Sequence, residues 1–102
     1  MTVAFELTTH TQNLLHRLQN LLPLTEDEIV QRGITEATMA RIMELRQQAA
    51  QLASMYTSLE NLEQKVKTEG VSPDDHTLYT DLIEWRAVRQ ELADLAAFLE
   101  SV

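Results

Sequence analysis

The sequence predicts an all-α protein built on one long antiparallel helical hairpin. Three observations favour this fold class. Only two glycines and two prolines occur in 102 residues, apolar residues recur at steps of three and four, and strand-like alternation is nearly absent. We therefore expect a single helical domain over residues 1–102, because a chain of this length has no room for a second domain.

A first helix is predicted over about residues 9–22. Thr8 or Thr9 can provide its N-cap, and Pro23 prevents the helix from continuing. Its apolar positions fall on one face at helical spacing. They are Leu7, Leu14, Leu18 and Leu21, with Leu15 and Leu22 beside them.

A short helix is predicted over about residues 26–32. Thr25 and Glu28 have the spacing of a capping box, and Gly33 is expected to end the helix. We expect both N-terminal helices to pack on the open end of the hairpin, because the start of the long helix carries a second apolar face. A helix of about 15 residues spans only about 22 Å, so these helices cannot cover the whole hairpin.

The first arm of the hairpin is predicted over about residues 35–69, which contain neither glycine nor proline. As one helix this arm would be roughly 50 Å long. Its apolar residues alternate at steps of three and four, which is typical of a coiled-coil seam. The seam consists of Ile42, Leu45, Ala49, Leu52, Tyr56, Leu59 and Val66.

The second arm is predicted over about residues 73–101. Gly70 favours a left-handed end for the first arm, and Ser72 followed by Pro73 matches the start of a helix. A connection this short forces two long helices into an antiparallel pair. The seam of the second arm consists of Leu78, Trp85, Val88, Leu92, Leu95, Leu99 and Val102.

The short turn also sets the register, which places Trp85 opposite Tyr56 and Leu59. Glu63 and Asp81 then fall inside the apolar seam, within about one turn of each other. Paired carboxylates in a dry site can share a proton or bind a metal ion. We favour a solvated polar layer that sets the register, since both residues lie near the end of the hairpin.

The far end of the hairpin is left as a two-helix arm with apolar residues outside its seam. Each helix of such an arm can bury only one stripe, so the arm is marginally stable alone. We expect a non-enzymatic interaction module, such as an adaptor, assembly factor or regulatory subunit, that forms a homodimer or docks on another protein. The predicted interface consists of Met55, Leu62, Tyr79, Ile83 and Phe98.

The sequence contains no signature of catalysis or of cofactor binding. It has no cysteine, no glycine-rich phosphate loop, and no Glu-x-x-His motif of the kind that binds metals in helical bundles. We therefore expect a protein that is not an enzyme and that needs neither a cofactor nor a metal.

The alternative hypothesis is a helix-turn-helix DNA-binding regulator that uses residues 25–46. The run from Gly33 to Thr38 resembles the core of such motifs, whose second helix reads the major groove. Thr38 and Arg41 would then contact DNA. The formal net charge of −8 opposes approach to a phosphate backbone, so DNA binding is the second hypothesis.

Charge and hydropathy also predict where the chain acts. Sixteen acidic side chains against eight basic ones oppose binding to nucleic acids and to anionic membrane surfaces. The N-terminus lacks the basic and apolar regions of a leader, and no apolar run approaches the roughly 20 residues that span a bilayer. We expect a soluble, cytoplasmic protein.

Overall fold

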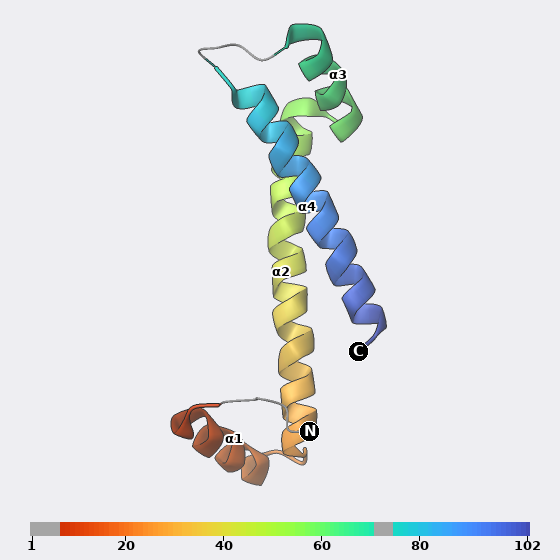
Figure 1. The fold of residues 1–102 in the computed structure, drawn as a ribbon. Helices are drawn as coiled ribbons and strands as arrows, with labels where there is room; N and C mark the ends of the chain where they lie inside the picture. Colours follow the sequence, from red (N-terminus) through yellow and green to blue (C-terminus); the bar gives the residue numbers. More distant parts are fainter. Residues whose placement is uncertain (1–6, 71–74) are drawn as a thin grey trace, which may run out of the picture. The chain divides into compact units, whose positions relative to one another are not determined.

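The computed structural model describes residues 7–70 and 75–102, which form four helices and no strand (Figure 1). The predicted all-α fold is confirmed, with a long helix packed against shorter ones. Contacts divide the chain into two compact units, Met1–Glu36 and Ala37–Val102. The helices are α1 (Thr9–Leu21), α2 (Glu26–Tyr56), α3 (Leu59–Glu69) and α4 (Thr77–Glu100).

Helix α1 has the bounds that its sequence predicts, to within one residue. The Thr8 side chain accepts a hydrogen bond from the backbone N–H of Thr11 at 3.1 Å, as an N-cap should. The helix ends at Leu21, and its C-cap is Leu22, whose backbone N–H donates to the Leu18 carbonyl. None of the residues in α1 is buried. The packing of the N-terminal helices on the open end of the hairpin stays a prediction, as does the single domain.

The predicted capping box is confirmed at the start of α2. The backbone N–H of Glu28 donates to Thr25 Oγ1 at 3.1 Å, and the N–H of Thr25 donates to Glu28 Oε1 at 3.3 Å. The first turn also contains Glu26 and Asp27, whose negative charges favour a helix N-terminus.

The predicted end of the short helix at Gly33 is wrong. Helix α2 continues through this glycine to Tyr56, so residues 26–32 and the first part of the long arm belong to one helix. A glycine in a helix interior costs only about 1 kcal/mol relative to alanine. A complete capping box on one side and 23 further helical residues on the other outweigh that cost.

We expect Gly33→Ala to raise the free energy of unfolding by about 0.5–1 kcal/mol, because alanine loses less backbone entropy in a helix. A Cβ atom at this position would meet nothing within 4 Å. Urea unfolding followed by circular dichroism measures the change. A loss of stability would instead indicate a turn with positive φ at residue 33.

The predicted continuous helix over residues 35–69 is also wrong, because it is broken at Thr57 and Ser58. Thr57 has a φ angle of 72°, in the left-handed region. Ser58 caps α3, and its side chain accepts from the backbone N–H of Asn61 at 3.1 Å. Figure 1 shows α3 displaced from the axis of α2 at this point.

The break exchanges the environments of two neighbouring residues. In an unbroken helix the seven-residue spacing would place Glu63 in the seam and Leu62 outside it. In the structure Leu62 is 0% exposed, whereas Glu63 is half-buried. Burying a leucine is worth about 1.5–3 kcal/mol, which offsets the roughly 1–2 kcal/mol cost of a left-handed residue.

The core of the second unit lies where α2, α3 and α4 meet. Trp85 shares this core with Leu59, and Tyr56 packs against it, as the predicted register requires. Ile42, Leu45 and Val88 are buried further along the seam. The central cluster consists of Leu52, Leu59, Leu62, Leu82 and Trp85.

Gly70 ends α3 as predicted, with a φ angle of 72° and its N–H donating to the Val66 carbonyl at 2.8 Å. The predicted helix start at Ser72 and Pro73 lies outside the described residues. Helix α4 begins at Thr77, whose backbone N–H donates to the Asp75 carboxylate at 2.9 Å.

Candidate interaction surface

Four of the five residues predicted to form an interface are exposed, and the fifth is not. The exposed fraction is 60% for Met55, 49% for Ile83, 45% for Tyr79 and 43% for Phe98. Leu62 is completely buried, so its predicted place on the outer face is wrong. The cause is the break before α3, which rotates this side chain into the core.

Three of these exposed residues are close in sequence to one tertiary contact. The Tyr56 hydroxyl donates to the Asp81 carboxylate and so joins the end of α2 to the start of α4. Met55 precedes Tyr56 directly, and Tyr79 and Ile83 each lie two residues from Asp81. Phe98 lies near the other end of α4.

The contact with Asp81 changes the acidity of the tyrosine. The hydrogen bond to the Asp81 carboxylate is the main reason that the pKa of Tyr56 rises to about 12. Partial burial and the negative charges of Asp81 and Asp75 act in the same direction. The phenol therefore stays a neutral donor, and Tyr56 acts here as a structural group.

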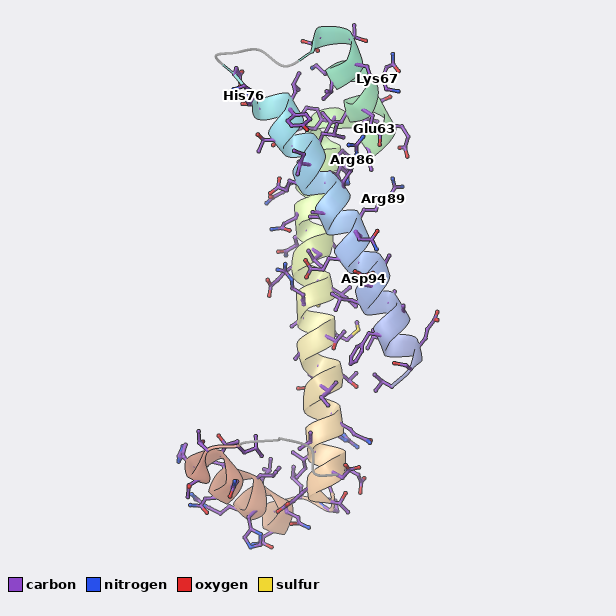
Figure 2. The ribbon with its side chains drawn as sticks, viewed as in Figure 1. Glu63, Lys67, His76, Arg86, Arg89 and Asp94 are labelled. Atoms are coloured by element: carbon purple, nitrogen blue, oxygen red, sulfur yellow. The ribbon has the colours of Figure 1, made fainter. Side chains whose placement is uncertain are left out.

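Glu63 and Asp81, the predicted polar layer, have separate partners. Asp81 accepts from Tyr56, whereas Glu63 lies 3.8 Å from Arg86 across α3 and α4 (Figure 2). Within residues 7–70 and 75–102, no group of three histidine or carboxylate side chains could hold a metal ion. The two carboxylates therefore help to join helices, each through its own contact.

Two further ion pairs cross between helices. Arg89 Nη1 lies 3.4 Å from Glu60 Oε1, between α4 and α3. Arg41 of α2 binds Glu91 of α4 in a bidentate manner, at 2.6 and 3.0 Å. These hydrogen bonds hold the pKa of Glu91 below its usual range. Both pairs are exposed, so they set the alignment of the helices more than their stability.

The structure has no turn at Gly33, where the helix-turn-helix alternative needs one. Such a motif needs two helices separated by a turn, but α2 is continuous through Gly33. Thr38, predicted to contact DNA, is buried at 9% exposure. Arg41 is engaged by the carboxylates of Glu91 and Glu44. DNA binding through Thr38 and Arg41 therefore stays a prediction, one that lacks the turn of the motif and has one of its two contact residues buried.

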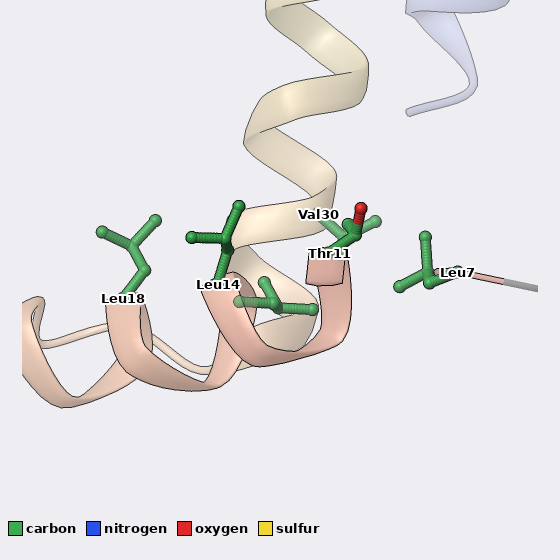
Figure 3. Close-up of a pocket in the computed structure, with 6 residues that line it drawn as sticks. Leu7, Thr11, Leu14, Leu18 and Val30 are labelled. Atoms are coloured by element: carbon green, nitrogen blue, oxygen red, sulfur yellow. The ribbon is translucent and has the colours of Figure 1, made fainter. Parts of the chain in front are cut away.

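The first unit has an apolar groove that sequence reasoning did not identify as a site (Figure 3). Its volume is about 310 Å³. The hydroxyl of Thr11 is hydrogen-bonded to that of Thr8 at 2.9 Å, so the lining has little polar character to offer. The groove suits apolar side chains better than a polar substrate. It is lined by Leu7, Thr11, Leu14, Leu15, Leu18 and Val30.

We found no match to this chain among protein-family models, curated proteins or solved structures. Among the helices of the described residues, none is both long enough and apolar enough to cross a membrane.

Proposed function

We propose that this chain is a non-enzymatic protein–protein interaction module that self-associates through the arm formed by α2, α3 and α4. The observation that carries this proposal is the exposure of Met55, Tyr79 and Ile83 around one end of the arm. In a cell, such a module would act as an adaptor, assembly factor or regulatory subunit, and we expect it in the cytoplasm.

The chemistry of these side chains supports an interface. Methionine is flexible and adapts to irregular partner surfaces, and tyrosine combines a large apolar ring with a polar tip. Both residue types are enriched in the buried centres of interfaces. Met55 lies on α2, while Tyr79 and Ile83 lie on α4, so a partner would contact two helices at once.

The polar side chains nearby support binding over catalysis. Tyr56 is bonded to Asp81, Glu63 to Arg86 and Arg41 to Glu91. Each of these pairs joins two helices of the same arm. A catalytic site would need polar groups that converge on an open pocket, whereas these groups satisfy one another.

We expect the wild-type chain to be a dimer and the double variant Met55→Glu with Ile83→Glu to be a monomer. Two carboxylates in an apolar interface should raise the dissociation constant by roughly 100-fold or more. Light scattering after size-exclusion chromatography measures the mass, and circular dichroism checks that the helices persist.

Leu18→Glu is the matched control. Leu18 is likewise an exposed apolar residue, with an exposed fraction of 38%, but it lines the groove of the first unit. This variant should remain a dimer. A wild-type chain that stays monomeric at high concentration would refute self-association. Loss of the dimer in Leu18→Glu alone would place the interface on the first unit instead.

A further inference from the structure

The junction between α2 and α3 is strained. Among the described residues other than glycine, Thr57 alone has a positive φ angle. A β-branched residue in the left-handed region is a genuine outlier, since its side chain crowds the backbone there. Thr57 is not a residue type that usually takes the left-handed conformation at a helix end, so the break is held by the Ser58 N-cap and by the packing of α3.

The sequence on both sides of this junction is compatible with one continuous helix. Leu52 and Leu59 keep their seven-residue spacing across the break, with Leu45 before them and Val66 after them. The backbone N–H of Thr57 still donates to the Ala53 carbonyl at 2.8 Å, as in an uninterrupted helix. A change in the backbone at residues 57 and 58 would therefore join α2 to α3.

Helices α3 and α4 are joined to each other independently of α2. Leu62 of α3 packs in the core with Leu82 and Trp85 of α4. Two ion pairs connect the same two helices, one between Glu60 and Arg89. The other lies between Glu63 and Arg86, which are labelled in Figure 2. These contacts survive if α3 and α4 move away from α2 as one body.

The contacts that α2 makes with this body can form equally well between two chains. They include the pair of Arg41 with Glu91, the bond from Tyr56 to Asp81, and the packing of Leu52 in the core. A second copy of the chain presents the same groups in the same order. Short strained hinges of this kind favour such exchange.

We propose that two copies of this chain exchange α3 and α4, with α2 and α3 of each copy joined into one helix at Thr57 and Ser58. This inference rests on the proposed self-association and names its geometry. In the exchanged dimer Leu62 keeps its packing with Leu82 and Trp85, because α3 and α4 move as one body, and Thr57 relaxes to a helical conformation. The exposed residue Met55 lies two positions from the hinge, where the two chains cross.

A pair of charge variants tests the exchange. In Arg41→Glu, residues 41 and 91 are both acidic, and in Glu91→Arg both are basic. In an exchanged dimer these residues meet between chains, so a mixed dimer restores two attractive pairs while each homodimer has two repulsive ones. After the variants are unfolded and refolded together, native mass spectrometry should find the mixed dimer at least about tenfold above the statistical ratio.

Variants of Thr57 test the hinge. Thr57→Gly tolerates a positive φ and disfavours a continuous helix, so it should raise the dimer dissociation constant roughly tenfold or more. Thr57→Ala favours the continuous helix and should lower that constant several-fold. Both variants leave the proposed contact residues unchanged.

The possible outcomes separate the two proposals. Statistical mixing of the charge variants, together with a dimer insensitive to Thr57, would overturn the exchange while self-association stands, because an ordinary dimer keeps residues 41 and 91 within one chain. A wild-type chain that never dimerises would overturn both proposals. Preferential mixing with opposite effects of the two Thr57 variants would support the exchange.

Discussion

Leu62→Ala is expected to lower the free energy of unfolding by about 2–5 kcal/mol. The side chain is 0% exposed and packs among Leu59, Leu82 and Trp85, so its removal leaves a cavity where three helices meet. Domains of this size are stable by only about 5–15 kcal/mol, so the loss is a large share of the total. Chemical unfolding followed by circular dichroism measures it.

Met55→Ala is the matched control for this prediction. The sequence pattern assigns both residues to the same outer surface, but Met55 is 60% exposed in the structure. Its truncation should therefore cost less than about 1 kcal/mol in a dilute solution where the chain is monomeric. Similar small effects for both variants would mean that α2 and α3 form one unbroken helix in the monomer, contrary to the structure.

The buried seam could be predicted from the sequence because it depends on local periodicity. Ile42, Leu45 and Leu52 are buried at the predicted positions in α2, and Trp85 and Val88 are buried in α4. Residues at a seven-residue spacing lie on one face of their helix, whichever helix packs against that face. The antiparallel pairing follows from the short connection, so it too could be predicted.

The break before α3 could not be predicted from periodicity, because it is decided by packing. The local preference for a continuous helix is outweighed only once Leu62 can be buried against Leu82 and Trp85. One signal was present: Ser58 is a favourable N-cap, and Glu60 follows in the first helical turn. That signal for a break competes with the seven-residue spacing of Leu52, Leu59 and Val66, which favours a continuous helix.

At Gly33 the error is the reverse: the sequence predicts the end of a helix, but α2 continues through this residue. Glycine is a common helix terminator only where the chain needs a positive φ angle. Gly70 has such an angle, at 72°, and does end α3, whereas Gly33 lies inside α2. Whether a glycine ends a helix depends on how strongly the residues on both sides favour a helix, and this differs between Gly33 and Gly70. The residue type alone does not decide it.

The candidate interface could be predicted only in part, because the face on which a residue lies depends on the phase of its helix. Met55, Tyr79 and Ile83 lie in helices whose phase is unaffected by the break, and they are exposed as expected. The phase of Leu62 depends on the break, so its predicted place was wrong. The groove of the first unit depends on Val30 of α2 lying beside the leucines of α1, which the face of a single helix cannot reveal.

Trp85→Ala is the second variant for which we expect a large effect, a loss of about 3–5 kcal/mol in the free energy of unfolding. Trp85 is only 8% exposed, and it packs in one cluster with Leu52 of α2 and Leu62 of α3. Its removal weakens the contacts of α4 with both other helices at once, so α4 should lose its fixed position in the arm.

Ile83→Ala tests whether this effect belongs to the core, because Ile83 lies two residues away on the same helix and is 49% exposed. It should cost less than about 1 kcal/mol in the monomer. Trp85→Phe should fall between the two, since a phenyl ring fills most of the same space. All three are compared by the circular dichroism signal during urea unfolding, because the chain has one tryptophan and its fluorescence is lost with it. A small effect of Trp85→Ala would mean that the position of α4 does not depend on the packing of Trp85 in the central cluster, contrary to its burial in the structure.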